Sequence, residues 1–102
     1  MHMPKTALGV FIALLGTHSA HARDLKPDEI LKLREAGTLQ AVELMNAAAQ
    51  ERHPHSVILE TEVEKEYGRY FYQLELRDAQ GITWDLEFDA VTGQILRDYQ
   101  DR

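Results

Sequence analysis

Side chains that could act as nucleophiles or metal ligands are scarce in this 102-residue chain, and their spacing fits no catalytic site. Cysteine is absent, which excludes thiol catalysis, disulfides and thiolate metal sites. Ser19 lies in a predicted leader and Ser56 in a predicted connection, so neither has an evident base. No glycine-rich phosphate loop occurs. We therefore predict that the protein has no catalytic residue and is not an enzyme.

Two histidines beyond the predicted leader, His53 and His55, flank Pro54. Zinc usually takes four ligands in a structural site, so two imidazoles alone make a poor one. Glu51 is near in sequence but is not a convincing third ligand. We expect no bound metal and no cofactor, and we interpret this segment as a solvated helix-to-strand connection.

Acidic side chains are far more numerous. The chain carries 17 Asp+Glu against 11 Lys+Arg, for a net charge of −6. This balance argues against nucleic acid or anionic lipid as the main partner, and it permits a basic protein surface or a cation. Six carboxylates are predicted to share the outer face of a sheet: Glu60, Glu62, Glu64, Glu75, Asp85 and Glu87. That face is either solvated, which would resist aggregation, or a docking surface for a basic partner.

The first 22 residues are typical of a secretory signal peptide. A short start carrying Lys5 precedes an apolar run over residues 6–16, and Ala20-His21-Ala22 has the small-x-small pattern of a cleavage site. The run is shorter than the roughly 20 residues that span a bilayer, so a retained anchor or a buried helix is the weaker alternative. We predict cleavage after Ala22, export to a bacterial periplasm and no stable membrane anchor afterwards.

The remaining chain predicts helices followed by strands. Pro27 suits a first helical turn and Gly37 a helix end, so residues 23–37 form an N-terminal helical segment. Thr38 is predicted to cap a second helix that ends before Pro54. From Val57 the apolar period changes to two, which predicts strands over residues 57–64, 69–77 and 82–89 and a short edge strand over 94–98. The fold class is α+β: an N-terminal helix or helical hairpin packs on one face of a three- to four-stranded antiparallel meander.

The same periodicity predicts which side chains form the core. These are the apolar residues facing the helices: Leu44, Met45, Ala48, Val57, Leu59, Val63, Tyr72, Leu74, Leu76, Trp84, Leu86, Phe88 and Ile95.

The end of the chain resembles the PepSY domain family. The resemblance rests on Tyr72-x-Leu74-x-Leu76 and on the ending Asp89-Ala-x-Thr-Gly-x-Ile95, and it implies a PepSY-like domain over residues 38–102. His55 departs from the family, in which many members have Gly after the Pro. The motif residues are interpreted as structural, because Asp and Gly suit a tight turn: Tyr72, Gly81, Trp84, Asp89, Thr92, Gly93 and Ile95.

The resemblance also implies a function. Relatives occur in the propeptides of secreted metallopeptidases, with an inhibitory or chaperone-like role, and as stand-alone exported proteins or parts of membrane proteins. We therefore expect a non-catalytic, monomeric or homodimeric periplasmic module that binds and restrains an exported peptidase through strand edges Val57–Glu64 or Gln94–Asp98. The alternative is an accessory module that engages the periplasmic domain of a membrane receptor such as a sensor kinase. A third possibility is a ligand pocket lined by Tyr70 or Tyr72.

Overall fold

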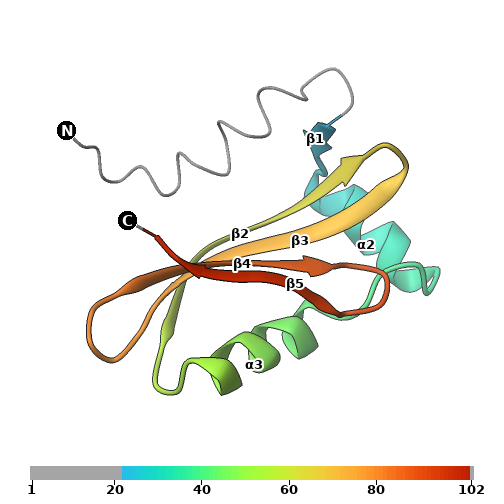
Figure 1. Ribbon diagram of the computed structural model, residues 1–102. Helices are drawn as coiled ribbons and strands as arrows, with labels where there is room; N and C mark the ends of the chain where they lie inside the picture. Colours follow the sequence, from blue (N-terminus) through green and yellow to red (C-terminus); the bar gives the residue numbers. More distant parts are fainter. Residues whose placement is uncertain (1–21, 102) are drawn as a thin grey trace.

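The computed structural model describes residues 22–101, which form a five-stranded antiparallel sheet covered on one face by two helices (Figure 1). The strands follow one another in space as they do in sequence. In chain order the elements are β1 (Ala22–Asp24), α2 (Pro27–Glu35), α3 (Val42–Arg52), β2 (Val57–Glu66), β3 (Arg69–Arg77), β4 (Thr83–Asp89) and β5 (Ile95–Gln100). The predicted α+β meander is thus confirmed, with β1 as a strand that the sequence pattern does not indicate.

The predicted leader lies outside the described residues except for Ala22. Within these residues no helix is long and apolar enough to cross a membrane.

Helix α2 begins where the sequence predicts. Pro27 occupies its first turn, and the backbone N–H of Lys26 donates to Glu29 Oε1 at 3.0 Å. The Arg23 guanidinium holds both carboxylate oxygens of Glu29, at 3.0 and 3.1 Å, and together these donors lower the pKa of Glu29 to about 2. Gly37, with φ of 80°, follows the end of the helix. The ion pair between Arg23 and Glu29 joins the short strand β1 to helix α2.

The second helix starts later than predicted. Thr38 does not cap it, because α3 begins at Val42 after Ala41. The intervening segment bonds to the β4–β5 turn instead. The backbone N–H of Gln40 donates to the Ala90 carbonyl at 2.9 Å, and its side-chain amide donates to the Val91 carbonyl at 3.2 Å. Local capping propensity is overridden here by a tertiary contact across the chain.

The core lies between the helices and the inner face of the sheet. Its buried apolar residues are Leu25, Leu39, Met45, Ala49, Val63, Tyr72, Leu74, Leu76, Leu86, Phe88 and Ala90. Ala48, Trp84 and Ile95 pack against this core while only partly buried. The central strands β3 and β4 therefore supply the predicted alternation of inner and outer side chains.

Three residues predicted for the core are on the surface. Leu44 is 63% exposed, Val57 59% and Leu59 41%. In β2 the reason is a bulge, because Ile58 pairs with Leu76 while Glu60 pairs with Glu75. The extra residue reverses the alternation, so that Ile58 faces the core in place of its two neighbours.

Candidate functional site

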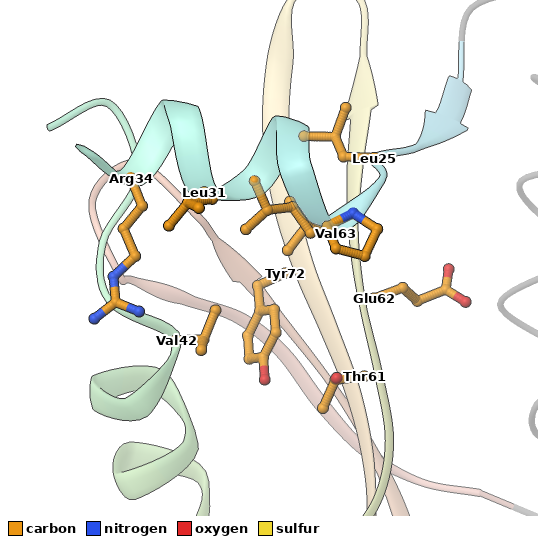
Figure 2. A pocket seen from close by; sticks show the side chains of 10 residues that line it. Leu25, Leu31, Arg34, Val42, Thr61, Glu62, Val63 and Tyr72 are labelled. Carbon is orange, nitrogen blue, oxygen red and sulfur yellow. The ribbon is translucent and has the colours of Figure 1, made fainter. Parts of the chain in front are cut away.

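A pocket of about 470 Å³ opens between α2 and β2 (Figure 2). It is mostly apolar and is lined by Leu25, Pro27, Ile30, Leu31, Arg34, Val42, Thr61, Glu62, Val63 and Tyr72. Tyr72 is fixed in place because its hydroxyl donates to Asn46 Oδ1 at 2.6 Å. Leu31 is 55% exposed, so an apolar group that enters the pocket would cover it. Of the two tyrosines named from the sequence, Tyr72 lines this pocket and Tyr70 lines a separate one of about 340 Å³.

The edge of β2 runs beside this pocket. Strand β1 pairs only with Glu64–Glu66, and the backbone N–H of Leu25 donates to the Val63 carbonyl at 2.8 Å. In an antiparallel strand the N–H and C=O of a residue point to the same edge. The N–H and C=O of the residue two positions away in the sequence point to that edge as well. The backbone of Thr61 therefore faces the same edge as that of Val63. Among residues 22–101, no strand covers this edge from Val57 to Glu62.

The six carboxylates predicted to share a face do lie on one side of the sheet. Strand register aligns Glu60, Glu75 and Asp85 in one row across β2, β3 and β4, and Glu62, Gln73 and Glu87 in the next. Basic residues reach this face at its edges, where Arg97 lies 3.4 Å from Glu87 Oε1 and Arg69 lies 3.5 Å from Asp89 Oδ2.

This acidic face is not uniformly solvated. Glu64 is 2% exposed and Asp85 is 0% exposed. Burial, reinforced by Glu66 and Asp24, raises the pKa of Glu64 to about 7. Burial and the Asp24 carboxylate likewise raise the pKa of Glu62 to about 7. These carboxylates differ from those on an ordinary solvated surface, where water would hydrate each charge.

The Asp89–Ile95 segment forms the turn between β4 and β5. Asp89 Oδ1 accepts the backbone N–H groups of Val91 at 2.8 Å and Thr92 at 3.1 Å, and Thr92 Oγ1 accepts that of Gln94 at 3.2 Å. Gly93 has φ of 81°, which favours glycine. These residue types are accounted for by the hydrogen bonds and conformation of the turn.

Comparison with known families agrees with this architecture. Residues 43–99 match the PepSY family, described as the peptidase propeptide and YPEB domain, over more than half of the chain. The protein belongs to the PepSY family. No curated protein and no solved structure matched the chain. The family description is consistent with a non-catalytic regulatory role.

The PepSY region supplies only part of the pocket. It extends from α3 to β5, so it includes Thr61, Val63 and Tyr72, whereas β1 and α2 precede it. The wall of the pocket formed by Leu25, Ile30 and Leu31 therefore belongs to the N-terminal segment.

The two PepSY-domain histidines do not come together as ligands. His53 Nε2 lies 2.9 Å from Asp98 Oδ1, and Arg52 Nε donates to Asp98 Oδ2 at 2.6 Å. The imidazole also packs on Trp84, with ring centroids 4.5 Å apart. His53 thus connects the end of α3 to β5, whereas His55 is exposed on the connection, with φ of 62°.

Proposed function

We propose that this protein is a non-catalytic, exported PepSY module that binds an extended segment of a secreted peptidase and restrains it. The observation that carries the proposal is the edge of β2 that no strand within residues 22–101 covers, beside the apolar pocket under α2. The family description, peptidase propeptide, supports a peptidase as the partner.

Binding would occur by strand addition. A partner strand placed along Val57–Glu62 would exchange backbone hydrogen bonds with Thr61, and the pocket would receive one of its alternate side chains. Because the pocket lining is mainly apolar, the preferred side chain is aliphatic or aromatic. Glu60 and Glu62 on the same strand favour a partner segment that carries basic residues.

The chain offers a matched pair of variants to test this site. Leu31 and Leu44 are both exposed helical leucines, but only Leu31 lines the pocket. We expect Leu31→Glu to weaken binding to, and inhibition of, a co-exported peptidase at least tenfold, whereas Leu44→Glu leaves both unchanged. Urea denaturation of both variants establishes that the fold persists.

Crosslinking identifies the class of partner. A photoreactive residue at Thr61 should capture a peptidase from envelope extracts, and one at Leu96, exposed on β5, should not. Capture of a receptor's periplasmic domain instead would favour the sensory alternative. Equal inhibition by the Leu31→Glu and Leu44→Glu variants would exclude the pocket as the docking site.

A further inference from the structure

Three carboxylates converge on the outer face of the sheet, opposite the core and away from the pocket. Glu75 in β3 and Asp85 in β4 are register partners. Asp101 follows β5, and its backbone N–H donates to the Thr83 carbonyl at 2.8 Å, which fixes the end of the chain beside β4. One oxygen from each side chain lies within 4.8 Å of the other two.

This arrangement is electrostatically incomplete. Asp85 is 0% exposed, and neither of its carboxylate oxygens has a hydrogen-bond partner. A buried carboxylate without a partner is costly, and two further carboxylates beside it increase that cost. Burial and these neighbours raise the pKa of Asp85 to about 7. Burial also raises the pKa of Glu75, and a hydrogen bond to Asp101, the charge of Asp101 and the charge of Glu60 add to this rise, while Arg77 opposes it.

We propose that Glu75, Asp85 and Asp101 form a binding site for a divalent cation, and that the cation is Ca²⁺. The ligands are carboxylate oxygens without imidazole or thiolate, which favours a hard cation over zinc or copper. Ca²⁺ accepts irregular sets of oxygen ligands at about 2.3–2.6 Å, whereas Mg²⁺ demands a near-ideal octahedron at about 2.0–2.1 Å. The cluster supplies only three protein oxygens, which lie within 4.8 Å of one another, and Ca²⁺ tolerates such a sparse, irregular set better than Mg²⁺. Water completes the coordination shell, since Ca²⁺ takes 6–8 oxygens.

The bound ion would join three strands. Because Asp101 lies beyond β5, its coordination holds the C-terminal residues against the central strands β3 and β4. Three carboxylates without a dedicated binding loop correspond to the weak affinities of extracellular calcium modules, with Kd of about 0.1–1 mM. None of the three ligands lies on the peptidase-binding edge, so either proposal can fail without the other.

Isothermal titration of the purified protein with CaCl₂ and with MgCl₂ tests the site directly. We expect binding of one Ca²⁺ in the stated range and at least tenfold weaker binding of Mg²⁺. Asp85→Asn should weaken Ca²⁺ binding at least tenfold. Glu87→Gln is the matched control because Glu87 lies on the same face, paired with Gln73 and Arg97, outside the cluster.

Terbium luminescence locates the ion. Tyr99 is the register partner of Asp85 on β5, so its excitation should sensitise Tb³⁺ bound at the cluster. Tyr99→Phe should lower that signal, with Trp84 as the remaining nearby donor, while leaving the Ca²⁺ affinity unchanged. Should Asp85→Asn fail to fold, Asp101→Asn provides the same test at the chain end. Absence of Ca²⁺ binding at ten times the expected Kd, or equal losses in Asp85→Asn and Glu87→Gln, would overturn the proposal.

Discussion

The bulge in β2 makes a quantitative prediction, because it decides which of three consecutive apolar side chains is buried. Ile58 is opposite Leu76, which is 0% exposed, and it packs against the core. Val57 precedes the bulge and is 59% exposed. Ile58→Ala therefore removes a core contact, whereas Val57→Ala removes a surface group.

The expected difference follows from burial. Truncating a fully buried Ile to Ala costs about 2–5 kcal/mol, so the half-buried Ile58 should lose about 1–2.5 kcal/mol of unfolding free energy. Val57→Ala should stay within about 0.5 kcal/mol, as exposed positions usually do. Both residues are β-branched, so the lost strand propensity is similar and largely cancels in the comparison.

Urea denaturation followed by tryptophan fluorescence measures both variants, since Trp84 packs against the core. In thermal unfolding each kcal/mol corresponds to about 4–8 °C for a domain of this size, so Ile58→Ala should melt at least about 2 °C below Val57→Ala. An equal or larger loss in Val57→Ala would refute the bulge and restore an uninterrupted alternation through Leu59.

Three further predictions concern single groups. Tyr72→Phe removes the donor to Asn46 and should cost about 0.5–1.5 kcal/mol in urea denaturation; an unchanged midpoint would show that the bond contributes nothing. Gly93→Ala places a Cβ at φ of 81° and should lower the melting temperature by an amount equivalent to about 1–2 kcal/mol, with a smaller loss for Gly93→Asn. Because burial raises the folded-state pKa of Glu62 and Glu64 to about 7, the folded state binds more protons than the unfolded state above pH 4.5. Stability measured in chelator should therefore increase as the pH falls from about 8 to about 5, and a flat profile would contradict these shifts.

The periodic part of the sequence predicted the sheet well. Alternation along β3 and β4 places Tyr72, Leu74 and Leu86 in the core, and the structure has them at 2%, 1% and 0% exposed. The alternation succeeds there because central strands are packed on one face throughout their length. The resemblance carried by the Asp89–Ile95 ending also named the right family.

The errors fall where a nonlocal contact decides the structure. Val57, Ile58 and Leu59 are all apolar, so the pattern leaves the starting phase of the strand open, and only pairing with β3 places the bulge. Thr38 has a good capping side chain, but Gln40 bonds to the β4–β5 turn and delays the helix. Strand β1 has three residues, too few for any period to be seen.

The carboxylate cluster shows the same limit. Glu75 and Asp85 were placed on the outer face from their strand positions, but Asp101 lies beyond the predicted edge strand and was not included. The signal for this cluster in the sequence was the acidic residue Asp101, three residues after Asp98. Sequence spacing alone cannot show that this end returns to β4, because the Asp101–Thr83 backbone bond depends on the β5 register.

The bounds of the PepSY region divide the proposed docking site into two parts with different consequences. The uncovered edge of β2 lies within residues 43–99, so strand addition would use the part of the chain that matches the family. The wall formed by α2 lies outside that region and carries Leu31, which lines the pocket. Backbone pairing is indifferent to the partner's sequence, whereas a pocket selects a side chain. Changes in α2 should therefore alter which segment is bound, and changes along β2 should alter how tightly any segment is bound.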